Sequence, residues 1–248
     1  MLAITRRSLW ISIGFAGQFV APFACSLLSV TLAIQRSSRK RVNAIRSERE
    51  DHQEGTRNSS VPRSLDTSRW SPELLLALEW KRFEEVCATY FETLQFRARL
   101  ATAGPDGGVD IHLFSQGELA PCIVVQCKAW RTRQVGVSTV RELRGAMASA
   151  NIAEGILVTI TGFTDDARDF AQRNNIHLID GSNLLEKFLA TEEEHQRTLL
   201  QVATSGDFTT PTCPSCGIKM VGRDVRNTGE AFWGCRNFPR CRTTLRGA

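Results

Sequence analysis

The sequence predicts an α/β protein in which a mixed β-sheet is flanked by helices, with a membrane-spanning helix before it and a small cysteine-rich module after it. Three features predict this: a charge-free apolar stretch near the N-terminus, a central alternation of helical and extended patterns, and four clustered cysteines near the C-terminus. The 248 residues can hold one sizeable core and an accessory module. The expected units are a transmembrane helix, a flexible basic linker, an α/β domain, a second linker and the cysteine-rich module, over residues 8–34, 35–69, 70–190, 191–210 and 211–248.

The N-terminal stretch from Ser8 to Ile34 contains no charged residue and is long enough to cross a hydrocarbon core of about 30 Å as a helix. A cleaved signal peptide competes with a retained anchor, because Arg6 and Arg7 resemble a signal's basic n-region. The apolar stretch is long, and no small-residue cleavage site is evident around residues 21–26. A retained anchor is therefore the favoured interpretation.

The charges that flank this stretch predict its orientation. More basic residues follow it than precede it, which places the C-terminal side in the cytoplasm; these are Arg36, Arg39, Lys40, Arg41 and Arg46. We therefore expect a single-pass protein of the inner (cytoplasmic) membrane with its soluble domains in the cytoplasm. The segment from Arg36 to Arg69 is polar and lacks apolar periodicity, which is typical of a tether.

The first half of the α/β domain predicts a helix followed by a β-hairpin. Apolar residues recur at helical spacing between Pro72 and Phe96. A Gly-rich turn over residues 104–108 then precedes an alternating strand, Val109–Phe114, and a second strand, Cys122–Lys128. Asp106 lies in that turn, where an aspartate commonly forms an Asx turn.

The second half predicts two helix-strand pairs and a final helix. Thr164 is the expected N-cap of the middle helix, and Ser182 is the expected N-cap of the last one, which runs to Leu189. The order α-β-β-α-β-α-β-α implies a mixed sheet covered by helices. The other predicted elements are a helix at Val137–Ala150 and strands at Gly155–Ile160 and Ile176–Ile179.

Three polar residues are expected to converge in the hairpin. Alternation places Gln126 and Lys128 on one face of their strand, and the hairpin brings Asp110 beside Gln126. A carboxylate, an amide oxygen and the main-chain carbonyl of Cys127 suit Mg²⁺, which takes few protein ligands and keeps water. Lys128 can then orient a nucleophile or stabilise developing charge. A strand that simply emerges into solvent is the competing interpretation of Gln126 and Lys128 alone.

These residues belong to a longer series of motifs that resembles the Mrr-like (type IV) restriction endonucleases of the PD-(D/E)xK superfamily. The series covers nearly half the chain and consists of Phe83-Glu84, Gly104-Pro105-Asp106-Gly107-Gly108-Val109-Asp110, Val125-Gln126-Cys127-Lys128, Val140-Arg141-Glu142-Leu143-Arg144-Gly145-Ala146, Gly162-Phe163-Thr164 and Leu178-Ile179-Asp180-Gly181. The resemblance implies a restriction-endonuclease-like fold and Mg²⁺-dependent hydrolysis of DNA phosphodiester bonds. It implies that Asp110, Gln126 and Lys128 are core catalytic residues and that Glu84 is an additional acidic participant.

Gln126 stands where the wider superfamily has a second carboxylate, although glutamine is the residue expected in the Mrr-like branch. The change removes one negative charge from the metal site. A DNA-binding protein that does not cut DNA is therefore the alternative to an endonuclease. A secreted nuclease released by signal cleavage is a third hypothesis, and a homodimer is a fourth, since one active centre cuts one strand.

The C-terminal cysteines predict a structural zinc site. Cys213 and Cys216 form one pair, and Cys235 and Cys241 form the other, which is the requirement for closed tetrahedral Zn²⁺. The other four cysteines lie singly in apolar surroundings and are expected to be small buried hydrophobes rather than disulfide partners. The module resembles the C4 zinc ribbon of type I bacterial topoisomerases, which implies DNA binding, and single-stranded DNA is the expected form.

Charge supports a polyanionic partner for this module. From Cys213 onward seven Lys and Arg face two acidic residues, so this segment accounts for the whole net charge of +5. Aromatic residues among the arginines could stack on bases, or they could form the module's own core; we expect both. The predicted DNA-binding residues are Trp233, Phe238, Arg236, Arg240 and Arg242.

Three further residues have a plain structural interpretation. His112 shares a strand face with Asp110 and could contact DNA, but a packed or half-exposed histidine is more common there. His177 is expected to be structural. Trp130 follows Lys128 and could stack on a base, although an aromatic at the end of a strand more often covers a core.

Overall fold

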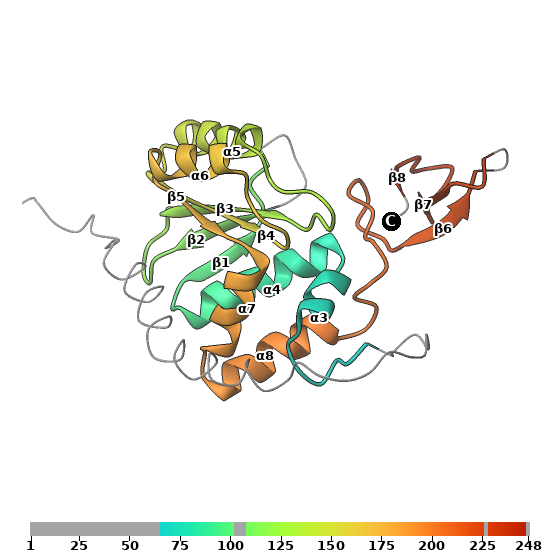
Figure 1. The fold of residues 1–248 in the computed structure, drawn as a ribbon, viewed down its shortest axis with the longest axis horizontal. Coiled ribbons are helices and arrows are strands. Elements are labelled where there is room, and N and C mark those ends of the chain that lie inside the picture. Colours follow the sequence, from blue (N-terminus) through green and yellow to red (C-terminus); the bar gives the residue numbers. More distant parts are fainter. Residues whose placement is uncertain (1–64, 102–107, 226–227, 247–248) are drawn as a thin grey trace, which may run out of the picture.

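The computed structural model describes residues 65–101, 108–225 and 228–246 (Figure 1). The predicted membrane helix, the linker up to residue 64 and Asp106 lie outside these ranges. In the described ranges, no helix has the length and hydropathy needed to span a bilayer.

The core of the fold is a five-stranded mixed sheet with the strand order β1-β2-β3-β4-β5. Strands β1, β2 and β3 are antiparallel neighbours, and β3, β4 and β5 are parallel neighbours, so the predicted mixed sheet is confirmed. The strands are β1 Arg97–Leu100, β2 Ile111–Phe114, β3 Ile123–Lys128, β4 Glu154–Thr159 and β5 Ile176–Ile179.

Helices cover both faces of this sheet (Figure 1). One core joins α4, α7 and α8 to Ile123, Val125 and Cys127 of β3. A second core, on the opposite face, joins α5 and α6 to Val124 of the same strand. The predicted alternation of β3 is thus confirmed. The helices are α3 Pro72–Ala77, α4 Trp80–Thr93, α5 Val137–Ser149, α6 Asp165–Gln172, α7 Gly181–Leu189 and α8 Glu193–Thr204.

The first predicted helix is two helices in the structure. Ser71 caps the start of α3. The helix ends at its C-cap Leu78, which has extended backbone angles. Glu79 is also extended and caps α4 by accepting a hydrogen bond from the Lys81 backbone N–H at 3.1 Å. Helical periodicity continues through this break, so apolar spacing alone did not reveal it.

Two later helices differ in how well their starts were predicted. Thr164 caps α6 as expected, with its hydroxyl accepting from the Ala167 N–H. The prediction of Ser182 as the cap of α7 was wrong, because Asp180 caps that helix and the Ser182 hydroxyl donates to Asp180 Oδ1 at 2.7 Å.

The segment predicted as a linker over residues 191–210 instead contains helix α8, which packs on α4. Leu199 and Ala203 are fully buried there, and Arg82 on α4 donates to the Val202 carbonyl and to the Ser205 hydroxyl. Two apolar residues at positions i and i+4 are enough to pack an otherwise polar helix against a neighbouring helix. The segment was predicted as a linker because most of its residues are polar, which made the two apolar positions easy to overlook.

The C-terminal module is a three-stranded antiparallel sheet of β6 Met220–Asp224, β7 Ala231–Cys235 and β8 Thr244–Arg246. Its small core consists of buried Cys213, Met220 and Cys235, with Trp233 and Leu245 packed against them. We call this module the ribbon.

Candidate active site and zinc centre

Asp110 lies immediately before β2, where the backbone joins it to both neighbouring strands. Its N–H donates to the Val125 carbonyl at 2.9 Å, and its carbonyl accepts from the Ala101 N–H at 2.8 Å. Its carboxylate Oδ2 accepts a hydrogen bond from the Cys127 N–H at 2.6 Å. The hairpin therefore holds this carboxylate next to the segment between Gln126 and Lys128, as the sequence predicted.

Gln126 is a buried amide with an unused acceptor. Its side chain is on the α5 side of the sheet with Val124, and the residue is 1% exposed. Among the described residues, its Oε1 has no hydrogen-bond partner. Such an oxygen is costly to bury unless a ligand or an ion uses it.

Gly108 makes room for this amide. Its φ is +81°, and a Cβ at this position would lie 2.6 Å from Gln126 Nε2. Only glycine satisfies both the left-handed backbone and the close approach. The glycine-rich turn is thus directly linked to the placement of Gln126.

Gly108→Ala should therefore displace Gln126. We expect a loss of about 1–3 kcal/mol in the free energy of unfolding and a drop of about tenfold or more in any activity of the site. Gly117→Ala is the matched control, since Gly117 has the same φ of +81° but nothing within 4 Å of its Cβ position. Denaturant unfolding and activity assays of both variants give the comparison. Equal effects would show that backbone strain, and not the contact with Gln126, is what Gly108 relieves.

Lys128 is half-buried at the end of β3, where the chain leaves the sheet. Its carbonyl accepts from the Thr159 hydroxyl at 3.0 Å and from the Ile160 N–H at 3.4 Å. These bonds tie the end of β3 to the end of β4. They fix the backbone from which the ammonium group projects.

Glu84 reaches the same place from helix α4. Burial, together with the nearby negative charge of Asp110, raises the pKa of its carboxyl to about 8, while Lys128 acts in the opposite direction. The structure therefore brings Glu84, Asp110 and Lys128 within electrostatic reach of one another. Glu84 was singled out from the sequence only through the family resemblance.

The raised pKa of Glu84 predicts a pH dependence of stability. The ordinary value is 4.5 and the folded-state pKa is about 8, so the folded chain binds the proton more tightly than the unfolded chain. The free energy of unfolding of the chain should therefore fall as the pH rises from 4.5 to about 8. The expected fall is on the order of 2 kcal/mol, less than the full pKa shift would give, because solvent screens a partly exposed charge.

Glu84→Gln should remove this slope and make the chain more stable than its parent above pH 8. Denaturant unfolding at pH 5 and pH 9 measures it, in buffer without divalent metal and without chelator, so that any zinc stays bound. Exposed Glu92→Gln, on the same helix, is the control and should leave the slope in place. An unchanged slope in Glu84→Gln would contradict the assignment.

Under the site lie two buried thiols, Cys87 of α4 and Cys127 of β3. Their mutual hydrogen bond, burial and the charges of Asp110 and Glu84 all raise the pKa of Cys127. Cys127 is therefore a neutral core residue, and Cys87 is buried in the same core, as the sequence predicted for isolated cysteines.

The gathered groups fit a hard divalent cation. Asp110 and Glu84 offer carboxylates, and Gln126 offers an amide oxygen that no described residue satisfies. Oxygen ligands of this kind suit Mg²⁺. The pKa of Glu84 is raised by burial first and by the charge of Asp110 second, and a bound cation would favour the charged form of both carboxylates.

The four predicted zinc ligands come together in the ribbon, where their sulfur atoms all lie within 4.8 Å of one another. The Sγ atoms of Cys213 and Cys241 are 3.7 Å apart, and those of Cys216 and Cys235 are 3.4 Å apart. Zn–S bonds of about 2.3 Å in a tetrahedron place sulfur atoms about 3.8 Å apart. The cysteines present therefore fit Zn²⁺.

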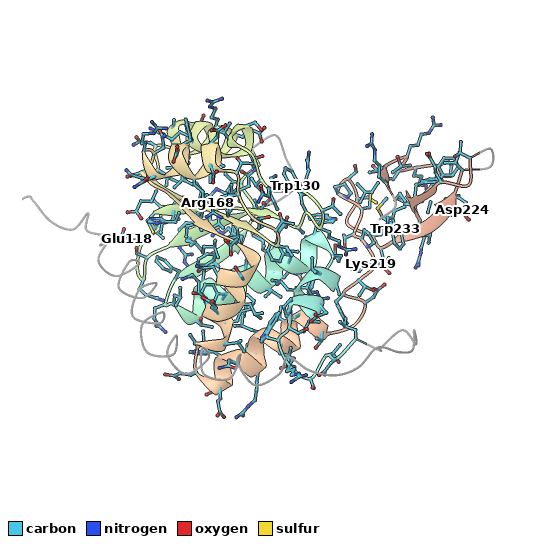
Figure 2. All side chains as sticks on the ribbon, in the orientation of Figure 1. Glu118, Trp130, Arg168, Lys219, Asp224 and Trp233 are labelled. Atoms are coloured by element: carbon cyan, nitrogen blue, oxygen red, sulfur yellow. The ribbon has the colours of Figure 1, made fainter. Side chains whose placement is uncertain are left out.

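The predicted DNA-binding side chains of the ribbon divide into two groups. Phe238 is 61% exposed, and Arg236, Arg240 and Arg242 are exposed beside it. Trp233, in contrast, packs against the ribbon's own core (Figure 2). The structure thus separates the two roles that the sequence left open for these aromatics.

The remaining sequence candidates, Trp130, His177 and His112, are half-buried. Trp130 is half-buried, with the Arg133 guanidinium 3.7 Å above its ring. His177 Nε2 lies 3.9 Å from Glu154 Oε2, and His112 is half-buried in β2.

Sequence reasoning missed Glu79, and it counted Lys219 among the cations available to a polyanion. Lys219 Nζ instead lies 3.1 Å from Glu79 Oε1. No local pattern could reveal a pair 140 residues apart.

Two family models match the chain. Residues 75–188 match the model described as a restriction endonuclease, and residues 210–247 match the model described as a topoisomerase DNA binding C4 zinc finger. Together they cover the α/β domain and the ribbon.

Two curated proteins are similar in sequence to part of the chain. The type IV methyl-directed restriction enzyme EcoKMrr of Escherichia coli (strain K12) is 32% identical over 137 residues, which cover 52% of this chain and 44% of that enzyme. The uncharacterized protein y4cE of Sinorhizobium fredii (strain NBRC 101917 / NGR234) is 35% identical over 100 residues, which cover 39% of this chain and 25% of that protein. The chain thus spans less than half the length of either relative.

Among solved structures, the chain is similar to the MspJI restriction endonuclease in complex with a 27-mer oligonucleotide, with a TM-score of 0.40 and 18% sequence identity. The match covers 64% of this chain and 42% of that chain. The DNA modification-dependent restriction endonuclease AspBHI gives a TM-score of 0.40 and 19% identity over 61% of this chain and 46% of that chain.

Proposed function

We propose that this chain is a Mg²⁺-dependent DNA endonuclease that acts in DNA restriction, because residues 75–188 match the restriction endonuclease model and residues 210–247 match the topoisomerase C4 zinc finger model. One observation carries the proposal: the family's two acidic positions and its lysine lie close together at the end of β3, the strand that also holds Gln126. Asp110 is bonded to the backbone of β3, and Glu84 lies within electrostatic reach of both Asp110 and Lys128.

The chain's own residues have distinct roles in this reaction. Asp110, Gln126 and Glu84 would hold the Mg²⁺, which when bound would polarise the phosphodiester and lower the pKa of a bound water. Lys128 orients the nucleophile and stabilises the charge that develops on the phosphate. The Cys127 N–H keeps the Asp110 carboxylate in place.

Supercoiled plasmid tests the proposal. The full chain with Mg²⁺ should convert it to nicked or linear DNA. The plasmid is used in methylated and unmethylated forms, because the E. coli relative is described as methyl-directed. Linear product without nicked intermediate would indicate that two chains act together, as in the hypothesis of a homodimer. Unchanged plasmid with several divalent metals and both methylation states would contradict an endonuclease.

One observation favours a second candidate, a DNA-binding protein that does not cut. Gln126 contributes no negative charge to the metal site, which lowers the affinity expected for a cation. The two candidates differ in the plasmid assay: binding by gel shift with no change in plasmid topology, across the same metals, would favour the second.

We also propose that the chain is tethered to the inner membrane by one helix over Ser8–Ile34, with the zinc ribbon and the endonuclease domain in the cytoplasm. The uncharged stretch and the basic residues after it support this. In fractionated bacterial cells, the full chain should remain in the membrane pellet after alkaline carbonate washing. A variant that lacks residues 1–34 should be in the soluble fraction. Recovery of the full chain as soluble protein would contradict the tether.

A further inference from the structure

The ribbon is joined to the first turn of helix α4 through one buried carboxylate. Glu79 is 4% exposed, and three groups of the ribbon segment donate to its side chain. The Thr212 N–H donates at 3.2 Å, the Thr212 hydroxyl at 2.9 Å and the Lys219 ammonium at 3.1 Å. A buried carboxylate is stable only when it has partners of this kind.

Three further hydrogen bonds surround this carboxylate. The Trp80 indole N–H donates to the Thr212 carbonyl at 2.8 Å, and the Glu79 N–H donates to the Phe208 carbonyl at 2.9 Å. Lys219 also donates to the Thr210 carbonyl at 2.8 Å. The contact is therefore a specific polar junction and not a loose tether.

The ribbon side of the junction depends on the zinc site. Thr212 and Lys219 pair in a short antiparallel bridge, and they directly flank the knuckle that begins with Cys213 and includes Cys216. The Cys213 N–H donates to the Ile218 carbonyl at 2.8 Å inside that knuckle. Without the metal, the cross-link between the two cysteine pairs that keeps this turn closed would be lost, and Thr212 and Lys219 would separate.

The other side of the junction leads to the active site. The Glu79 carboxylate that accepts from the ribbon also accepts from the Lys81 N–H, which begins α4. The Glu79 carbonyl accepts from the Phe83 N–H at 2.9 Å, and Glu84 is the next residue. Loss of the ribbon contacts would leave the charge of the Glu79 carboxylate unpaired. The carboxylate would then no longer be held in place to cap the first turn of α4.

We propose that Glu79 is a positioning residue that couples the two metal sites: the zinc-loaded ribbon holds Glu79, and Glu79 holds the first turn of the helix that carries Glu84. Zinc in the ribbon is therefore a condition for an ordered nuclease centre as well as for DNA binding by the ribbon itself.

Hydrogen exchange measured by mass spectrometry on the full chain tests the coupling without reference to activity. Cys216→Ser with Cys241→Ser removes zinc without a chelator. This double variant should raise exchange about tenfold or more at residues 79–84, in addition to the ribbon itself. In a Glu79→Ala background, residues 79–84 should already exchange fast, and the further loss of the zinc ligands should raise the exchange rate of these residues only slightly.

Lys219→Met covers the case in which Glu79→Ala unfolds the domain, because it weakens the junction from the ribbon side alone. It should also raise exchange at residues 79–84. Arg197→Met is its matched control, since Arg197 pairs with Glu193 at 3.2 Å on the exposed face of α8 and its loss should leave α4 unchanged. The proposal is overturned if loss of the zinc ligands, and likewise Lys219→Met, raises exchange only in the ribbon and leaves residues 79–84 as they were.

A second measurement rests on the proposed function. Mn²⁺ binding followed by electron paramagnetic resonance should weaken about fivefold or more in the zinc-ligand double variant and in Lys219→Met, but not in Arg197→Met. If Mn²⁺ binds the zinc-ligand double variant and Lys219→Met with the same affinity as the parent chain, the coupling is overturned. If no variant binds Mn²⁺, the proposed metal-dependent centre fails, while the exchange experiment still decides whether Glu79 links the ribbon to α4.

Discussion

Asp110→Asn and Lys128→Ala should each lower DNA cleavage about a thousandfold, while the chain stays folded and still binds DNA. Asp110→Asn keeps the shape of the side chain and an oxygen for the Cys127 N–H, which donates to Oδ2 at 2.6 Å in the parent. It removes the charge that a divalent cation needs. Lys128→Ala removes the ammonium group and leaves the backbone bonds of Lys128 to β4 unchanged.

The measurement is the initial rate of plasmid cleavage, with circular dichroism to check folding and a gel shift to check binding. Asp169→Ala and Arg173→Ala are the controls, because both residues are exposed on or beside α6 on the sheet face opposite α4. These controls should cleave at the parent rate. If Lys128→Ala retained a tenth or more of the activity, Lys128 would not have the role assigned to it.

Cys235→Ser should empty the ribbon of zinc and unfold it. The chain should bind about one zinc per molecule, and this variant should bind almost none. In zinc-finger peptides the metal contributes about 10–16 kcal/mol to folding, and a module whose core is only Cys213, Met220 and Cys235 with their neighbours has little else to stabilise it. Affinity for single-stranded DNA should fall about tenfold or more, since Arg236, Arg240 and Phe238 would lose their fixed arrangement.

Zinc content by atomic spectroscopy and DNA affinity by fluorescence anisotropy are the two measurements. Cys122→Ser is the matched control, because Cys122 lies in the α/β domain and its thiol donates to the Leu113 carbonyl, which a serine can also do. It should retain zinc and DNA affinity. A parent chain without zinc, or a Cys235→Ser variant with full zinc, would contradict the assignment of these four cysteines.

Much of the α/β domain was predictable because it follows from local rules. Alternation placed Val124 and Cys127 on opposite faces of β3, and the cap at Thr164 follows from a side chain that satisfies a nearby N–H. Strand β1 was missed because it is a four-residue edge strand in which two arginines alternate with Ala98 and Leu100. Its partner on β2, and not its own composition, makes it a strand.

The candidate site was predicted unevenly for the same reason. The glycine-rich turn and the hairpin were enough to bring Asp110 beside the strand of Gln126 and Lys128, since both lie within about twenty residues of it in the sequence. Glu84 depended on family resemblance, because an amphipathic helix does not specify which residue at the border of its apolar face turns inward.

The sequence by itself determined the order of elements from β2 to α7, the hairpin that brings Asp110 beside the strand of Gln126 and Lys128, and the four cysteines of the ribbon. These depend on short-range sterics, turn geometry and ligand spacing. The tertiary structure alone decided that Gln126 Oε1 is buried among described residues without a partner, that burial and Asp110 raise the pKa of Glu84, and that Glu79 pairs with Lys219. Burial and charge pairing depend on distances in space, and the Glu79–Lys219 pair joins residues 140 positions apart, which no local pattern encodes.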